Sequence, residues 1–224
     1  MNSIKKNSPP CAEKFPISSN QHGYKLIDPY DWIRDDNWQE VLHSPNVLKK
    51  EIRDYIDKEN QWTDNQLSNL LPSKEIIFNE IKGRMKEEDK SLPQKDGSWF
   101  YFSETKKDEE YSILKRYKAN SSIKNSKIIH NWNQESKGFE YFKPGGASYS
   151  PDHNLLAWSF DSKGSEFFSI KVKDLECKKK FRDQVNNTDG NIIWSIDGSG
   201  FYFIKMDENH RPSSLWFHNI NTKE

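Results

Sequence analysis

The chain has 224 residues, of which 33% are hydrophobic and 30% carry a charge. Its 34 basic and 34 acidic side chains give no net charge, so no overall field recruits nucleic acid or an anionic membrane. Aromatic residues make up 13% of the chain, and their large rings bury enough area to indicate a folded protein despite this polarity.

The N-terminal segment, the lack of long apolar segments and the two cysteines indicate the cellular compartment of the protein. The N-terminal segment has Lys5 and Lys6 but no apolar stretch behind them, so we expect neither a signal peptide nor an anchor. No segment is long and apolar enough to predict a membrane span. Cys11 and Cys177 are far apart and match no metal or redox spacing, which is typical of a reducing compartment. We therefore expect a cytoplasmic protein with no nucleic-acid or membrane partner.

The N-terminal third predicts an extended arm followed by helices. About twenty residues containing several prolines indicate the extended segment. Ser44 is a suitable N-cap and Pro45 a suitable first helical residue, and Pro72 should end that helix. Ser73 could then cap a shorter helix that Gly83 ends. The first helix is supported by residues at roughly helical spacing: Leu48, Ile52, Tyr55, Ile56, Trp62 or Thr63, Leu67 and Leu70.

Beyond Pro93 the pattern changes to strands and turns. Three segments begin with Asp and continue into a mostly apolar, aromatic-bearing strand, at residues 96–102, 152–158 and 197–203. Each is followed by a second predicted strand, at residues 111–117, 167–173 and 215–220. A third strand is predicted at residues 127–131 in the first unit, and no room remains for one after Asn221.

A strand-only repeat of this length is typical of propeller blades, although unrelated hairpins in a β-sandwich could give a similar pattern. The turn, strand, loop, strand order recurs, which favours the propeller. We therefore predict a mainly β fold. It is a partial β-propeller of about two and a half blades, preceded by an extended and helical arm.

Several motifs, weak singly, occur together in a specific order. The motifs are H-G at 22–23, D-P-Y-D-W-I-R-D-D at 28–36, Y-I at 55–56, E-N at 59–60, E-I-K-G-R at 80–84, S-P-D at 150–152, Asp161 with G-S-E at 164–166, Trp194 with D-G at 197–198, and D-E-N-H-R-P at 207–212. The combination resembles the oligopeptidase B branch of the prolyl oligopeptidase family of serine peptidases, and the resemblance runs from about His22 to the last residue. The R-D-D triplet at residues 34–36 and the G-R pair at 83–84 favour that branch over prolyl oligopeptidase itself.

The resemblance implies a propeller that covers an α/β-hydrolase domain and admits only short peptides, which the branch cleaves after Lys or Arg. It implies that residues 1–72 are an arm that packs on the hydrolase domain. Residues 73–224 would be the incomplete N-terminal part of the propeller. The catalytic hydrolase domain itself is expected to be absent from this chain, and no cofactor is implied.

The residues expected for serine hydrolysis are missing from the sequence. No pair of glycines brackets a serine as Gly-x-Ser-x-Gly, and P-G-G-A-S at residues 144–148 is the nearest imitation. None of the six histidines has a metal-ligand spacing such as His-Glu-x-x-His. The acidic clusters at 87–89 and 108–110 are typical of solvated loops. We therefore predict no catalytic, cofactor-binding or metal-binding residue.

Four charged residues in the motifs admit two interpretations. Arg34, Asp35, Asp36 and Arg84 could form ion pairs that hold arm, propeller and hydrolase together. Alternatively they could serve local capping and surface pairing, each worth little. Either way the predicted role is structural.

Three functional hypotheses follow. The first is a truncated N-terminal region of an oligopeptidase B-like endopeptidase, inactive alone and marginally stable because of open blade edges. The second is one subunit of a split peptidase, in which a separately encoded hydrolase chain completes the site and short peptides are then substrates. The third is a non-enzymatic interaction module derived from a propeller.

Overall fold

The structure is a computed structural model that describes residues 8–177 and 180–220. It divides into two compact units, the first ending at Met85 and the second beginning at Lys86. The boundary follows the second long helix, whereas the sequence analysis placed the division at Pro72. No described helix combines the length and the apolar character that crossing a membrane requires.

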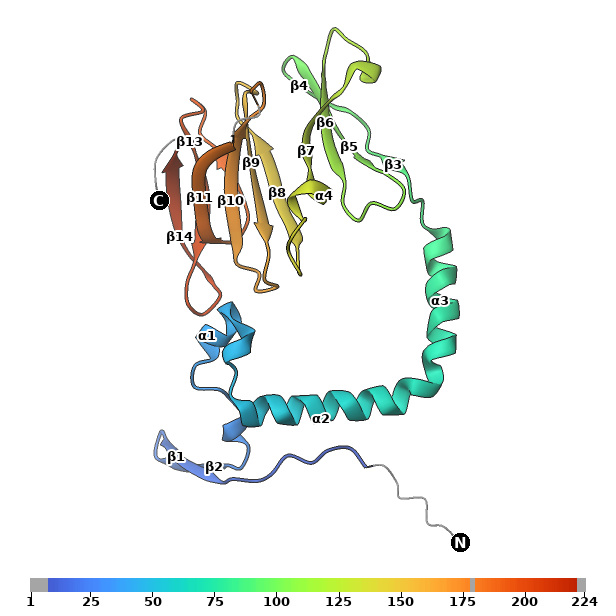
Figure 1. Ribbon diagram of the computed structural model, residues 1–224. Helices are drawn as coiled ribbons and strands as arrows, with labels where there is room; N and C mark the ends of the chain where they lie inside the picture. Colours follow the sequence, from blue (N-terminus) through green and yellow to red (C-terminus); the bar gives the residue numbers. More distant parts are fainter. Residues whose placement is uncertain (1–7, 178–179, 221–224) are drawn as a thin grey trace. The chain divides into compact units, whose positions relative to one another are not determined.

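The first unit has a hairpin and three helices (Figure 1). The hairpin turns at His22 and Gly23, which both have positive φ, of 52° and 84°. This hairpin lies where the sequence predicted only an extended segment. The elements are β1 (Ile17–Gln21), β2 (Tyr24–Asp28), α1 (Trp38–His43), α2 (Lys50–Leu67) and α3 (Leu71–Arg84), with 3-10 turns at Asp31–Ile33, Pro45–Val47 and Ser68–Leu70.

The predicted ends of these helices were partly wrong. The Ser44 side chain makes no capping hydrogen bond, Pro45 opens a 3-10 turn, and α2 begins only at Lys50. Pro72 does not terminate a helix, because it lies in the first turn of α3, where a missing N–H costs nothing. Gly83 lies inside α3, one residue before its end.

The second unit consists of antiparallel strands that follow one another as three blades (Figure 1). The first blade contains β3 (Asp89–Lys90) and β4 (Gln94–Asp96), which both pair with β5 (Trp99–Thr105), then β6 (Ile113–Lys118) and β7 (Lys127–Asn131). The second contains β8 (Lys143–Tyr149), β9 (Leu155–Asp161), β10 (Phe168–Asp174) and β11 (Lys180–Thr188). The third contains β12 (Ile193–Trp194), β13 (Gly200–Met206) and β14 (Pro212–Asn219). A 3-10 turn at Ile123–Asn125 precedes β7, and α4 (Trp132–Glu135) follows it.

These blades confirm the mainly β prediction. All three turn-and-strand repeats coincide with β5, β9 and β13, and the predicted third strand coincides with β7. The second and third blades form one seven-stranded sheet, although β11 and β13 are joined by a single pair, Thr188 with Lys205. Residues 221–224, where the sequence left no room for a strand, lie outside the described residues.

The turn before the second strand of a blade is built in the same way twice. In the second blade the Ser150 hydroxyl donates to Asp152 over 2.5 Å and accepts from the backbone N–H of Leu155. In the third blade Ser195 donates to Asp197 over 2.6 Å and accepts from the N–H of Gly200. The Ser-x-Asp spacing thus fixes the turn by side-chain bonds to the backbone, which explains the repeat in the sequence.

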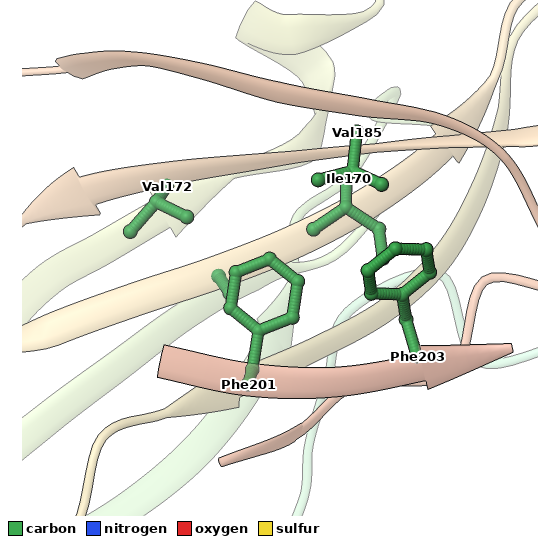
Figure 2. Packing of buried hydrophobic residues seen from close by; sticks show 6 residues of the cluster. Ile170, Val172, Val185, Phe201 and Phe203 are labelled. Carbon is green, nitrogen blue, oxygen red and sulfur yellow. The ribbon is translucent and has the colours of Figure 1, made fainter. Parts of the chain in front are cut away.

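Apolar clusters fill the spaces between blades. Trp158 and Phe160 of β9 pack with Trp132 and Phe142, which lie between the first and second blades in the chain. Ala157, which precedes Trp158 on β9, joins a second cluster with residues of the third blade. Successive residues of a strand point to opposite faces, so β9 is buried on both sides. Figure 2 shows five members of the second cluster, Ile170, Val172, Val185, Phe201 and Phe203.

Candidate functional site

A group of polar side chains in the second unit joins the first and second blades. We call it the seam, and define it by the inter-blade polar contacts of Asp96, Tyr101, Arg116, His130, Tyr149, His153, Lys173 and Glu176. None of these residues was singled out as functional from the sequence. Alternation places Arg116 on the face opposite Ile113 and Tyr117, so the strand pattern gave no signal that its side chain is buried.

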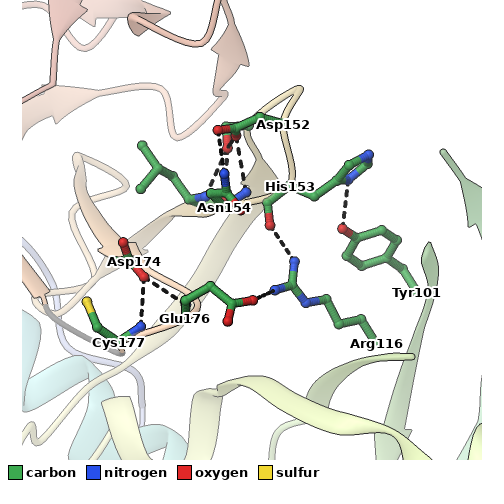
Figure 3. Close-up of polar contacts among 10 residues, drawn as sticks. Tyr101, Arg116, Asp152, His153, Asn154, Asp174, Glu176 and Cys177 are labelled. Carbon is green, nitrogen blue, oxygen red and sulfur yellow. Dashed lines mark hydrogen bonds and ion pairs between the residues drawn. The ribbon is translucent and has the colours of Figure 1, made fainter. Parts of the chain in front are cut away.

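Arg116 of β6 is the centre of one half of the seam (Figure 3). Its side chain is only 3% exposed and donates a hydrogen bond to the backbone carbonyl of His153 in the second blade. The guanidinium carbon lies 3.9 Å from the ring centre of Trp99, in cation–π geometry. A carboxylate oxygen of Glu176 lies 3.6 Å from Nη2. Arg116 therefore holds a loop of the second blade against the first.

Two stacked tyrosines continue the same contact. Tyr101 of β5 and Tyr149 of β8 have ring centres 3.9 Å apart and planes 6° from parallel. The Tyr101 hydroxyl lies 2.9 Å from Nδ1 of His153, and the Tyr149 hydroxyl donates to Asp96 over 2.8 Å. Burial is the main cause that raises the pKa of Tyr149 far above its ordinary value, and the hydrogen bond to Asp96 is the second. Both phenols therefore stay protonated at neutral pH and act as hydrogen-bonding groups.

The second half of the seam contains His130 of β7 and Lys173 of β10. The imidazole is 1% exposed, and its Nδ1 lies 3.0 Å from the lysine Nζ. Tryptophan rings flank it, with Trp132 at 4.3 Å and Trp158 at 5.0 Å between ring centres. These groups are arranged for packing and positioning.

The nearest imitation of a nucleophile lies in a strand. Ser148 belongs to β8 and pairs with Ala157 of β9, and its carbonyl accepts a hydrogen bond from Trp194. A nucleophile elbow instead places its serine on a sharp turn between a strand and a helix. The geometry around Ser148 therefore does not suit acyl transfer.

The histidines are dispersed over the described elements. His22 lies in the hairpin turn, His43 ends α1, and His153 and His210 have positive φ in loops. His210 Nε2 lies 2.8 Å from the carbonyl of Ser165, and His218 is buried in β14. In the described part of the chain, no group of three or more His, Cys, Asp or Glu side chains could hold a metal ion.

The charged residues of the N-terminal motifs have local partners. Asp35 is buried and accepts the backbone N–H of Lys49 over 2.8 Å, and that bond is the main cause that lowers the pKa of its carboxyl. The Lys49 ammonium lies 2.9 Å from Asp36, and Arg84 pairs with Glu80 one turn earlier in α3. Asp35 and Asp36 thus hold the residue that precedes α2. These contacts agree with the local pairing interpretation.

The first unit also has a groove between its arm and α2. Its volume is about 780 Å³, and its wall includes three aromatic rings, Phe15, Trp32 and Tyr55, above Ile52. Trp32 lies edge-on to both other rings and donates its indole N–H to the carbonyl of Glu13. The aromatic contacts attach the arm to α2.

Comparison with known proteins identifies this arrangement of arm and blades. The family model for "Prolyl oligopeptidase, N-terminal beta-propeller domain" matches residues 9–224. The chain belongs to the prolyl oligopeptidase family. The resemblance to the family and the propeller fold, both predicted from the sequence, are therefore confirmed.

Relatives of the chain include a dipeptidyl aminopeptidase BI from Pseudoxanthomonas mexicana, which is 26% identical over 89% of this chain. Protease 2 from Moraxella lacunata is 24% identical over 95% of it. The chain spans only 28% and 30% of the lengths of these two relatives.

Solved structures show the same fold. Oligopeptidase B from Leishmania major superposes with a TM-score of 0.84 at 22% identity, covering 97% of this chain and 32% of that one. Oligopeptidase B from Trypanosoma brucei, with bound antipain in its closed form, gives 0.81 at 22% identity, over 96% and 31%. In this prolyl oligopeptidase family member, the seam thus joins the first two propeller blades.

Proposed function

We propose that this chain forms the arm and first propeller blades of an oligopeptidase B-like serine endopeptidase. In this proposal the blades position and restrict short peptides, and an α/β-hydrolase domain outside these residues cleaves them after Lys or Arg. Residues 1–224 alone are then inactive. The absence of Gly-x-Ser-x-Gly from the sequence and the position of Ser148 within a strand support this division of labour.

The observation that carries the proposal is the apolar surface of α3. Five large apolar side chains of α3, and that of Met85 directly after it, are between 56% and 68% exposed. The five in the helix are Leu71, Ile76, Ile77, Phe78 and Ile81. A contiguous group of exposed apolar side chains marks a surface that another protein or domain covers. A helix that presents such residues on several sides is suited to burial between structural parts. A hydrolase domain, on the same polypeptide or on a separate one, fits this need.

The test is reconstitution with a separately produced α/β-hydrolase domain of a protease 2 relative. We expect residues 1–224 alone not to hydrolyse a peptide anilide that ends in arginine. The mixed chains should hydrolyse it and release the aniline. Phe78→Glu should abolish association and cleavage by placing a charge on the apolar helix. Asn79→Glu introduces the same side chain at a neighbouring polar position and should retain both. Cleavage by residues 1–224 alone would refute the proposal, and so would a failure of the two chains to associate.

We also place the protein in the cytoplasm in this proposal. Cys11 and Cys177 are both exposed and unpaired with each other, which suits a reducing compartment. Fractionation of the source cells, followed by detection of the chain, tests that assignment. Recovery from an oxidising extracellular fraction would contradict it.

A further inference from the structure

The contact between Lys173 and His130 requires a particular protonation state. A lysine ammonium has donors only, so the lone pair of a neutral imidazole Nδ1 must accept the hydrogen bond over 3.0 Å. The proton of the ring then resides on Nε2. If the ring takes up a second proton, two positive charges face each other at hydrogen-bonding distance inside the seam.

Aromatic rings from two other elements contact the imidazole. Its ring is 1% exposed and lies between Trp132 of α4 and Trp158 of β9. The Lys173 ammonium is itself 5.1 Å from the centre of the Trp158 ring. Lysine, histidine and tryptophan therefore form one packed contact across the two blades.

Other charges face the pair from the neighbouring elements. Glu135 of α4 and Asp174, the last residue of β10, line a cavity of about 400 Å³ together with His130 and Lys173. Asp174 already accepts the backbone N–H groups of Glu176 and Cys177, and the bond from Cys177 is the main cause that lowers the pKa of its carboxyl. Asp174 is thus an anion committed to its own loop.

The strand paired with β7 contributes two cations. On β6, Leu114 is the partner of His130, and Lys115 and Arg116 follow it. Their charged ends contact Glu104 and Glu176. A charge gained by His130 is therefore opposed by Lys173 at contact distance and favoured by the carboxylates of the cavity wall.

From this geometry we propose that His130 is a proton-sensitive switch in the seam, whose protonation weakens the contact between the first and second blades. The sign follows from linkage. An unfolded chain takes up the imidazole proton near pH 6.5, whereas the native contact needs the neutral ring. Stability from this contact is present above that pH and is lost as the pH falls below it. The proposal does not depend on the peptidase assignment.

The test compares urea unfolding of the full chain at pH 7.5 and pH 5.5. For the unchanged protein, the contribution of His130 raises the unfolding equilibrium constant by about tenfold between these two pH values. His130→Asn keeps an acceptor for Lys173 but cannot be protonated, so its pH effect should be smaller by that factor. His22→Asn alters a histidine of the first unit at a turn position that asparagine accepts, and should behave as the unchanged protein.

A second measurement covers the case in which His130→Asn does not fold. In histidine-labelled protein, the ring resonances of His130 should titrate at higher pH in Lys173→Met than in the unchanged chain, because the repelling charge is gone. Equal pH effects in His130→Asn and the unchanged chain would overturn the proposal. An unchanged titration of His130 in Lys173→Met would overturn it as well, by showing that the carboxylates of the cavity wall dominate.

Discussion

Replacing Arg116 by methionine tests whether the seam holds the first two blades together. Methionine keeps an unbranched apolar stem in the same space but removes the guanidinium. The change deletes the hydrogen bond to the carbonyl of His153 and the ion pair with Glu176, which Figure 3 shows. It also deletes the stacking on Trp99. We expect the free energy of unfolding to fall.

The magnitude follows from the burial of each contact. A hydrogen bond from a charged donor contributes about 1.5–3 kcal/mol. A desolvated cation–π contact contributes roughly 1–2 kcal/mol. The ion pair contributes little, about 0–1 kcal/mol, because the Glu176 side chain is 68% exposed. Arg116→Met should therefore lower the free energy of unfolding by about 3–5 kcal/mol.

The assay is urea unfolding of the full chain, followed by tryptophan fluorescence. Glu176→Gln is the matched control, because it removes only the exposed ion pair and should change the free energy by less than about 1 kcal/mol. A loss below about 1 kcal/mol in Arg116→Met would refute the view that the buried contacts hold the seam. An equal loss in Arg116→Met and Glu176→Gln would show that the exposed pair carries the energy instead.

Three further changes test other parts of the fold. Gly200→Ala should destabilise the third blade by about 1–3 kcal/mol in thermal unfolding, because a Cβ there would lie 2.1 Å from the carbonyl oxygen of His218. Gly83→Ala should instead stabilise by about 0.5–1 kcal/mol, since its Cβ would meet nothing within 4 Å in α3; a loss would contradict the helical assignment. Hydrogen bonds from the Ser195 hydroxyl and from the N–H and hydroxyl of Ser199 lower the pKa of Asp197 to about 2. The melting temperature should therefore fall as the pH drops from 4 towards 2, because the carboxylate that accepts these bonds becomes protonated. The fall should be smaller in Asp197→Asn, which has no carboxylate to protonate. Equal slopes for the two proteins would show that the turn does not need the charge.

The strands that could be predicted from the sequence have local signals. β5, β9 and β13 each follow a turn that begins with Asp, and their aromatic-bearing pattern continues into a buried strand. By contrast, β8 was missed because its sequence, K-P-G-G-A-S-Y, contains residues that usually argue against a strand. Gly145 is needed there because a Cβ would lie 2.3 Å from the hydroxyl of Ser159 on β9. That reason lies in the neighbouring strand and cannot be read locally.

The seam was beyond the reach of the sequence for a similar reason. His130 and Lys173 are 43 positions apart, and nothing in either local pattern indicates that their side chains meet. Blade-to-blade packing decides such contacts, and a single sequence gives no information on it. The contact of Asp35 in the N-terminal motif is closer in sequence, since its partner Lys49 is only 14 positions away.

The order of the strands has a consequence for how the chain acquires its structure. Within the second unit's blades, successive strands are joined by short loops and pair with one another, except that β3 and β4 both pair with β5. Among the described strands, the backbone pairing between the second and third blades consists of the pair of Thr188 and Lys205. Ordering such neighbours closes short loops, so little chain entropy is lost before the first contacts form. Each blade can therefore assemble soon after it leaves the ribosome, in the order of synthesis. The apolar faces that later meet across the blades are exposed to solvent until the next blade arrives.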